Sequence, residues 1–244
     1  MNFKETVAQR LDENGQNKEL HASAHNFLKA SLAPKYSYNF SWLGRPIIQY
    51  PQDMIAMQEI IWDVKPDLII ETGIAHGGSL IFSAAMLELV SVCTGIEGEV
   101  LGIDIDIRPH NRKAVEEHPL SKRITMIEGS SIDLEIFEQV NEKSKFKKRI
   151  LICLDSNHTH EHVLAELELY APLTTVGSYC VVFDTFVEDM PKELAGERPW
   201  GPGNNPKTAV HQYLKGHPEF EIDKNIDNKL LISVAPDGYL KRVR

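Results

Sequence analysis

Long hydrophobic runs are absent from this 244-residue sequence, and its first residues, MNFKE, are polar and do not resemble a signal peptide. Cysteine is scarce: Cys93, Cys153 and Cys180 lie in apolar segments without paired spacing, which predicts small core residues in a reducing compartment. The sequence has no excess of basic residues, and its net charge is -9. This acidic balance argues against nucleic acid or an anionic membrane as the main partner. We therefore expect a cytoplasmic protein without an integral membrane segment.

The remaining composition is that of an ordinary globular protein, with 42% hydrophobic and 25% charged residues. Residues up to about Lys29 read as a polar, amphipathic helix, and residues 34–46 form an aromatic-rich segment with turn residues. We interpret this segment as a lid, a packing arm or a contact between subunits. The predicted division is a helical and aromatic arm over residues 1–50 and one α/β domain over residues 51–244.

Strands alternate regularly with helices after Asp53, which we expect to cap a helix over 54–64. The tail differs, because its last two strands are joined by a short turn and must be antiparallel. The pattern predicts a doubly wound, mostly parallel seven-stranded sheet with a C-terminal antiparallel hairpin and an N-terminal helical extension. The expected strands cover 67–71, 100–105, 123–128, 149–154, 178–183, 220–223 and 229–234, and the expected helices cover 79–93, 109–117, 133–142, 160–170 and 206–215.

A buried strand runs directly into a glycine-rich turn and a helix at residues 67–79 (DLIIETGIAHGGS). Gly73, Gly77 and Gly78 allow a sharp turn and a close approach of a ligand to the backbone, and Ser79 is expected to cap the next helix. Dehydrogenases, kinases and methyltransferases all use such a turn, and a βα turn without a ligand has the same pattern. The turn alone therefore predicts a nucleotide-type cofactor without naming it.

Two acidic residues narrow the choice of cofactor. Asp104 ends the second strand, where an acid can hold the ribose hydroxyls of an adenosine. Glu71 precedes the first glycine, where a carboxylate repels a pyrophosphate but suits the ammonium and sulfonium charges of S-adenosylmethionine. These residues favour S-adenosylmethionine over NAD, with an NAD-dependent oxidoreductase as the alternative.

Acidic residues also end the fourth and fifth strands. Asp155 and Asp184 are expected at the same edge of the sheet, where two carboxylates can share a hard cation such as Mg²⁺. The alternative is that both only cap the following helices. His158 lies three residues after Asp155 and is a candidate general base. His160 and His162 complete the run HTHEH, but we expect them to be solvated or packing residues rather than zinc ligands.

The third strand is followed by Gly129, Ser130 and Ser131, where class I methyltransferases contact the adenine ring. These residues can equally begin the helix ahead of Asp133. A Gly- and Pro-rich loop over 188–205 follows the fifth strand and is interpreted as a substrate lid or a subunit contact.

These motifs together resemble the cephalosporin-hydroxylase-like family of class I S-adenosylmethionine methyltransferases, which is related to rhamnosyl and macrolide-sugar O-methyltransferases. The resemblance spans roughly residues 38–235. It is carried by the following segments: WLGRPI at 42–47, YPQD at 50–53, KPDLIIETG at 65–73, GGS at 77–79, GIDID at 102–106, GS at 129–130, DSNH at 155–158 and VFDT at 182–185.

The resemblance implies a Mg²⁺-assisted methyl transfer to a hydroxyl of a sugar, a nucleotide sugar or a related polyhydroxylated metabolite, by an enzyme that forms homo-oligomers. It implies that Asp155 and Asp184 bind the metal and that Asp155 and His158 act in catalysis. Phe183 departs from the pattern, because sugar-methylating relatives have a glutamate there, so metal-free catalysis by His158 and a non-catalytic cofactor-binding subunit remain alternatives. The cofactor is expected to contact Glu71, Gly73, Ala75, Gly77, Ser79, Asp104, Ile105, Gly129, Ser130, Ser131 and Asp155.

Overall fold

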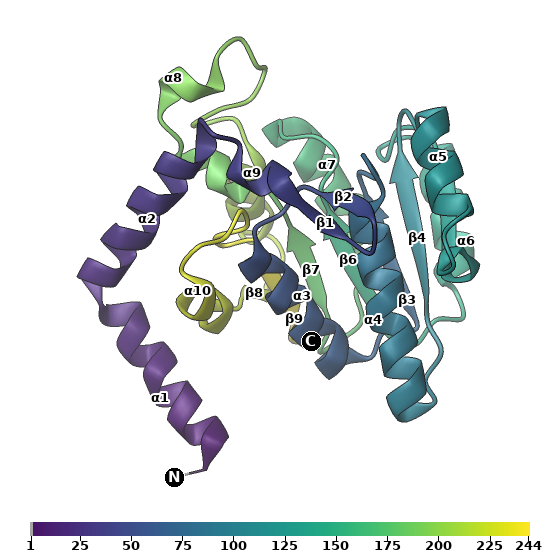
Figure 1. The fold of residues 1–244 in the computed structure, drawn as a ribbon, viewed down its shortest axis with the longest axis horizontal. Helices are drawn as coiled ribbons and strands as arrows, with labels where there is room; N and C mark the ends of the chain where they lie inside the picture. Colours follow the sequence, from purple (N-terminus) through teal and green to yellow (C-terminus); the bar gives the residue numbers. More distant parts are fainter. Residues whose placement is uncertain (1) are drawn as a thin grey trace.

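A mixed seven-stranded sheet with the order β5-β4-β3-β6-β7-β9-β8 forms the centre of the computed structural model, which describes residues 2–244 apart from the side chains of residues 194 and 195 (Figure 1). The first five strands in this order are parallel, and β9 and β8 are antiparallel. The strands are β1 (Phe40–Trp42), β2 (Arg45–Ile47), β3 (Leu68–Thr72), β4 (Glu99–Asp104), β5 (Ile124–Glu128), β6 (Ile150–Leu154), β7 (Tyr179–Val182), β8 (Phe220–Ile222) and β9 (Tyr239–Arg242). The α-helices are α1 (Phe3–Gln16), α2 (Lys18–Leu32), α3 (Pro51–Val64), α4 (Gly78–Thr94), α5 (Pro109–Glu116), α6 (Leu134–Ser144), α7 (His160–Tyr170), α8 (Lys192–Ala195), α9 (Pro206–Tyr213) and α10 (Lys224–Leu230).

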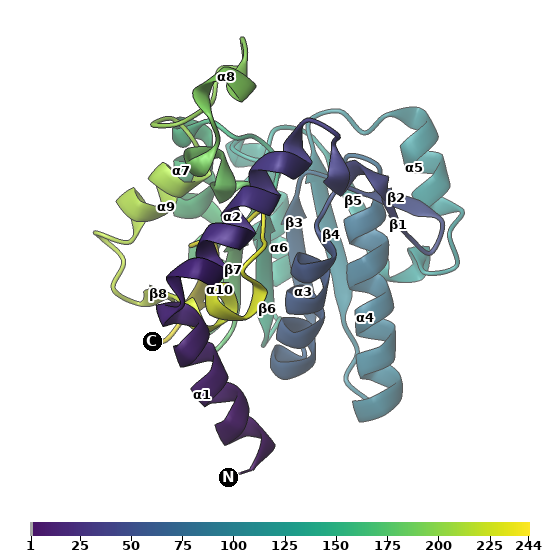
Figure 2. The ribbon, with the colours of Figure 1, turned by 60° about the vertical axis from the view of Figure 1, so that its left-hand side comes forward.

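Both faces of the sheet are covered, which explains why its central strands are apolar without polar alternation. Along β3, Ile69 packs in the core beneath α3 and α4, whereas Leu68 and Ile70 pack in the core formed with α6, α7 and α9. Figures 1 and 2 show α3 and α4 lying along the first of these faces. The predicted doubly wound α/β fold is therefore confirmed.

The parallel register brings the C-terminal ends of four strands to one edge of the sheet. Thr72 at the end of β3 is paired with Ile103 of β4 and with Leu154 of β6, and Leu154 is paired with Val182 of β7. The residues that follow these strands therefore lie next to one another, as the crevice rule for open α/β sheets requires.

The antiparallel pair at the C-terminus is confirmed, but the predicted strand over 229–234 is wrong. Asp223 caps α10 by accepting the backbone N–H of Asn225, and the helix continues to Leu230. Leu230, the last residue of this helix, is buried in the core, and Val234 from the apolar run that follows packs against the core as a partly buried residue. The partner strand of β8 is β9, which also pairs with β7.

The predicted N-cap role of Asp53 is also wrong. The helix α3 begins at Pro51 after Tyr50, and Asp53 is a fully buried residue of its first turn. Its carboxylate accepts hydrogen bonds from the Tyr239 hydroxyl at 2.8 Å, the Val234 amide at 3.0 Å and the Ser233 hydroxyl. Asp53 thus fastens α3 to the C-terminal strand.

This burial makes a testable contribution to the pH dependence of stability. Burial raises the pKa of Asp53 from 3.8 to about 6, although its three hydrogen bonds oppose the shift. The folded state therefore holds this proton more tightly, and the linked stabilisation is present below about pH 4 and lost as the pH rises through about 6. In urea unfolding, the stability advantage of the wild type over Asp53→Ala should shrink by up to ~3 kcal/mol between pH 4 and pH 7. An advantage that is constant with pH contradicts this assignment, and the exposed Asp12→Ala serves as the control.

The N-terminal segment forms two helices rather than one. Asn17 ends α1 and caps α2 through its side chain, which accepts the Leu20 amide, and α2 extends to Leu32. The helix α1 packs against α10, and the hairpin of β1 and β2 packs against α4.

None of the helices in residues 2–244 is long and apolar enough to cross a bilayer. The expectation that all cysteines are core residues holds for Cys153 and Cys180, but Cys93 near the end of α4 is exposed.

Candidate functional site

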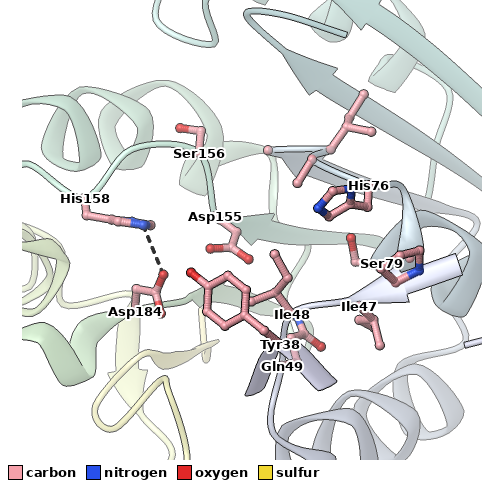
Figure 3. A pocket seen from close by; sticks show the side chains of 15 residues that line it. Tyr38, Ile47, Ile48, Gln49, His76, Ser79, Asp155, Ser156, His158 and Asp184 are labelled. Carbon is pink, nitrogen blue, oxygen red and sulfur yellow. Dashed lines mark ion pairs between the residues drawn. The ribbon is translucent and has the colours of Figure 1, made fainter. Parts of the chain in front are cut away.

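Three potential ligand groups converge beyond the ends of β6 and β7. Asp155 directly follows β6, His158 lies in the loop before α7, and Asp184 follows β7 by two residues. One oxygen or nitrogen from each of these side chains lies within 4.8 Å of those of the other two, and His158 Nε2 is 3.2 Å from Asp184 Oδ2 (Figure 3). The sequence prediction that strand order brings these residues to one rim agrees with this geometry.

The backbone at the end of β7 directs Asp184 toward this group. Phe183 is buried in the core beneath α3 and α4, where a second carboxylate would be costly. Asp184 then adopts a left-handed conformation with φ of 53°, which non-glycine residues rarely do. The Thr185 hydroxyl donates to the Pro236 carbonyl at 2.6 Å and fixes the turn.

Carboxyl groups are concentrated around Asp155. Loss of solvation raises the pKa of Asp155 well above its ordinary value of 3.8, and the nearby carboxylates of Asp184 and Glu71 raise it further. A cation bound here would relieve this repulsion and favour the ionised carboxyl group. The group is therefore suited to a metal ion or to a positively charged ligand.

The three groups line an open cavity of about 240 Å³ between the glycine-rich turn and the N-terminal arm. In Figure 3 the Tyr38 ring, which is 58% exposed, extends over the cavity with its hydroxyl toward Asp155 and Asp184. The wall mixes apolar, amide and imidazole groups, as in pockets for polar small molecules. The lining residues are Tyr38, Pro46, Ile47, Ile48, Gln49, Gly73, Ile74, Ala75, His76, Gly78, Ser79, Asp155, Ser156, His158 and Asp184.

A second cavity of about 100 Å³ adjoins the first and shares Gly73 and Ser156 with it. It lies beyond the ends of β4 and β5, where an adenosine was expected. Its other lining residues are Ile103, Asp104, Ile105, Ser130, Ser131, Asn157 and His162. The two cavities together give an elongated site with an acidic end and an end rich in hydroxyl groups.

The helix after the glycine-rich turn begins earlier than predicted. Gly77 is the N-cap and α4 starts at Gly78, so Ser79 does not cap the helix. The Ser79 hydroxyl instead donates to Glu71 Oε1. Burial raises the pKa of Glu71 from 4.5 to about 7, with the Ser79 hydrogen bond opposing the shift. Glu71 does not line either cavity itself; its charge lies one side chain behind the wall that Ser79 forms.

Asp104 has a structural task in addition to its place in the second cavity. Its Oδ2 accepts the backbone N–H groups of Ile74 at 2.8 Å and Ala75 at 3.0 Å, and its Oδ1 accepts that of Asp106 at 3.1 Å. The carboxylate thus fixes the glycine-rich turn from the neighbouring strand. A carboxylate offers about four acceptor positions, so one remains for a ribose hydroxyl.

If S-adenosylhomocysteine, the product of a methyltransferase, binds as the sequence predicts, Asp104→Ala should weaken its binding by roughly ten- to hundredfold, because the hydrogen bonds that Asp104 makes to the turn are lost together with the one expected to the ribose. Isothermal titration calorimetry measures this change. The neighbouring Asp106→Ala is the matched control, because Asp106 is exposed and its carboxylate lies 3.9 Å from Arg108. Equal affinities for both variants would exclude Asp104 from the cofactor site.

The β1–β2 hairpin holds the other side of the turn. Arg45 Nε donates to the His76 carbonyl at 2.9 Å, and Arg45 Nη2 donates to Asn111 Oδ1 at 3.0 Å. Asn111 in turn donates to the Ala75 carbonyl at 2.8 Å. A Cβ on Gly78 would lie 2.1 Å from the Pro46 carbonyl oxygen, so the hairpin can pack this closely only against glycine.

The loop after β7 reaches the same site. The Trp200 ring meets the His158 ring edge to face with centroids 5.0 Å apart, and the Arg198 guanidinium lies 4.7 Å from the Trp200 centroid. Glu188 accepts the Gly203 amide at 2.7 Å and so folds the loop back. This position is compatible with the predicted lid.

Some of the residues considered in the sequence analysis lie outside both cavities. Gly77 and Gly129 do not line either cavity, and Asp133, not Ser130 or Ser131, caps α6. His160 bridges α7 and α9, since its ring nitrogens lie 2.7 Å from Thr208 Oγ1 and 3.0 Å from Gln212 Oε1.

Sequence reasoning missed several residues that line the cavities. Ser156 and Asn157 follow Asp155 directly, so their position after a strand was an available signal. The others come from the arm, the turn or a helix and had no motif of their own. The missed polar or aromatic residues are Tyr38, Gln49, His76, Ser156, Asn157 and His162.

Comparisons with known proteins assign the chain to a family. The sequence profile described as Rhamnosyl O-methyltransferase/CmcI matches residues 34–243. A rhamnosyl O-methyltransferase of Mycobacterium tuberculosis is 34% identical over 195 residues, covering 78% of this chain and 73% of the relative, and that of Mycobacterium leprae is 31% identical over 207 residues, covering 83% and 82%.

Two solved structures share the fold. CmcI with Mg and SAM has a TM-score of 0.58 at 21% identity and covers 85% of this chain and 78% of its own. An O-methyltransferase from Bacillus cereus with SAH has a TM-score of 0.50 at 15% identity and covers 84% and 82%. The chain therefore belongs to the Rhamnosyl O-methyltransferase/CmcI family and is an S-adenosylmethionine-dependent O-methyltransferase with the class I fold.

Proposed function

We propose that this enzyme transfers the methyl group of S-adenosylmethionine to a hydroxyl of a sugar, a nucleotide sugar or a related polyhydroxylated metabolite. The observation that carries the proposal is the convergence of Asp155, His158 and Asp184 in a cavity that adjoins the one beside Asp104 and Ser130. The names of the mycobacterial relatives support a sugar acceptor. The family assignment leaves no support for the NAD-dependent alternative.

The cofactor would extend across both cavities. Its adenosine would occupy the cavity with Asp104, Ile105 and the serine pair, and its methionine part would pass Gly73 toward Ser79. The ammonium and sulfonium groups would then lie in the negative field of Glu71 and Asp155. Because the pKa of Glu71 is raised to about 7 by burial, binding of this cation would favour its ionised form.

The residues present suit a divalent cation at the acidic end. Two carboxylates and one imidazole come within 4.8 Å of one another, and the repulsion that raises the pKa of Asp155 is the kind that a cation relieves. Asp155 and Asp184 would hold Mg²⁺, which when bound would lower the pKa of an acceptor hydroxyl and orient it. Phe183 supplies no ligand, so the protein offers fewer carboxylates than sugar-methylating relatives are expected to have.

His158 would remove the acceptor proton. Its Nε2 is held by Asp184 at 3.2 Å, an arrangement that fixes the ring and stabilises positive charge on it. As the acceptor oxygen attacks the methyl carbon, the carbon–sulfur bond breaks, S-adenosylhomocysteine leaves and the proton moves to His158. Positioning and deprotonation would supply most of the acceleration. If no metal is required, the same His158–Asp184 pair would still provide the base.

The acceptor would enter from the open side of the first cavity. Tyr38, Gln49 and His76 present hydrogen-bonding groups there, and Trp200 encloses His158. Several hydrogen-bonding groups beside the Tyr38 ring suit a polyhydroxylated ring better than an apolar acceptor.

Methyl transfer to an acceptor panel tests this function. The purified enzyme and S-adenosylmethionine are incubated with rhamnosides, nucleotide sugars and, as the aromatic comparison, a catechol, each with Mg²⁺ or with EDTA. We expect S-adenosylhomocysteine to form together with a methylated sugar, and EDTA to suppress the reaction. Methylation of the catechol alone would contradict the sugar assignment, and full activity in EDTA would favour the metal-free form. The proposed homo-oligomer is tested by the molecular mass in solution.

A further inference from the structure

A fully buried carboxylate stands behind the second cavity. Glu166, in the middle of α7, is 0% exposed. Its Oε1 accepts the Ser156 hydroxyl at 2.7 Å, and its Oε2 has no hydrogen-bond partner among the described residues. A carboxylate so poorly supplied with donors costs stability, so core packing alone does not explain it.

His162 connects this carboxylate to the cavity. It precedes Glu166 by one helical turn, and its Nε2 lies 3.6 Å from Glu166 Oε1. The same nitrogen is 3.2 Å from Ser156 Oγ and 3.1 Å from Ser131 Oγ. His162 lines the second cavity together with both serines, and the Tyr170 hydroxyl holds the Ser131 carbonyl at 2.6 Å. Glu166, Ser156 and Ser131 thus hold the histidine ring at the wall of the cavity, and Tyr170 holds the backbone of Ser131.

The direction of these hydrogen bonds determines which ring nitrogen carries a proton. The Ser156 hydroxyl donates its hydrogen to Glu166 Oε1. The 3.2 Å contact between Ser156 Oγ and His162 Nε2 is then a hydrogen bond only if Nε2 carries the hydrogen, and Ser131 Oγ at 3.1 Å can accept the same hydrogen. In the neutral ring this leaves Nδ1 as an acceptor. Within residues 2–244, the hydrogen bonds and ion pairs of this ring all use Nε2, so Nδ1 is available to a ligand.

We infer that His162 is a specificity-determining residue whose Nδ1 accepts the exocyclic amino group of the cofactor's adenine, and that Glu166 is a positioning residue that sets its tautomer through Ser156. The inference rests on the proposed placement of adenosine in the second cavity. An amino group donates to Nδ1, whereas a 6-oxo purine presents an acceptor to an acceptor and is rejected. A site built to satisfy one hydrogen bond discriminates strongly against a ligand that leaves it unmade.

Calorimetry with two ligands tests this inference. S-Adenosylhomocysteine carries the amino group, and S-inosylhomocysteine is its 6-oxo analogue. We expect the wild type to bind the adenosyl compound roughly ten- to hundredfold more tightly. In His162→Ala this ratio should fall to within about threefold of unity. Thermal unfolding and circular dichroism show whether the variant is folded.

Two further variants separate positioning from general damage. Glu166→Gln keeps the volume but lets an amide N–H face Ser156, so the tautomer is no longer fixed and the ratio should fall several-fold. His160→Ala is the matched control, because His160 contacts Thr208 and Gln212 rather than either cavity, and its ratio should equal that of the wild type.

The outcomes distinguish this inference from the proposed function. Tight binding of the adenosyl compound with an unchanged ratio in His162→Ala, or in Glu166→Gln if the first variant does not fold, overturns the role of His162 alone. Failure of the wild type to bind either compound overturns the cofactor placement itself.

Discussion

Replacing His158 with alanine should lower kcat by roughly 10²- to 10⁴-fold, because the acceptor hydroxyl loses its general base. The affinity for S-adenosylhomocysteine should change little, since the imidazole faces Asp184 at 3.2 Å and not the second cavity. Initial rates of S-adenosylhomocysteine formation at saturating acceptor measure the first effect, and calorimetry measures the second.

The matched control for this variant is His211→Ala. His211 lies on α9 with its Nε2 3.2 Å from Asp237 and is half exposed, so it also loses a histidine–carboxylate pair but away from the site. Wild-type turnover in His158→Ala with the true acceptor would show that His158 is no base. A raised pH that restores activity in the variant would support deprotonation as the missing step.

Gly73→Ala should have the second large effect, on both folding and binding. Gly73 has φ of 92°, and an added Cβ would lie 2.1 Å from the Asp155 carbonyl oxygen and 2.6 Å from its carbonyl carbon. Backbone atoms cannot swing aside as a flexible side chain can, so the loop after β6 must move. We expect a loss of roughly 2–4 kcal/mol in unfolding free energy and a more than tenfold loss of S-adenosylhomocysteine affinity.

Gly177→Ala isolates the conformational part of this cost. Gly177 has a similar φ of 86°, but an added Cβ meets nothing within 4 Å. Its substitution should therefore cost only about 1–2 kcal/mol from the left-handed backbone and leave cofactor affinity unchanged. If the two variants lose the same stability and bind equally well, the close contact between Gly73 and Asp155 has no part in shaping the site.

Local sequence signals were sufficient to predict the central sheet. Apolar runs such as 150–154 have a single plausible structure when helices separate them, and parallel strands must end at a common edge. This is why Asp155, His158 and Asp184 could be placed together before the structure was known. The positions of Asp104 and the serine pair followed from the same rule.

Features that depend on contacts between distant segments could not be predicted in this way. The apolar residues 229–234 had the composition of a strand, but the capped helix α10 and the bonds from Asp53 to Ser233 and Val234 determine a different structure. Asp53 itself had the sequence of an N-cap, and only the fold reveals its partner Tyr239.

The same limit applies to the walls of the site. Ser79 had the sequence position of a helix cap, but its hydroxyl binds Glu71 across the turn. Tyr38 reaches the cavity only because the arm folds over the sheet edge. His162 was interpreted as a packing or solvated residue because it lies in the first turn of a helix, and its contact with Ser131, 31 residues away, appears only in the fold. The place of such side chains in the site can be assigned only from the three-dimensional structure.

The most direct test of the account is a crystal structure with S-adenosylhomocysteine and Mg²⁺ or Mn²⁺ bound. The account predicts the adenine beside Ser130 and His162, the sulfur near Asp155, and a metal peak between Asp155 and Asp184 with His158 next to the remaining open space. Adenine outside the second cavity, or a metal bound away from both aspartates, would contradict it.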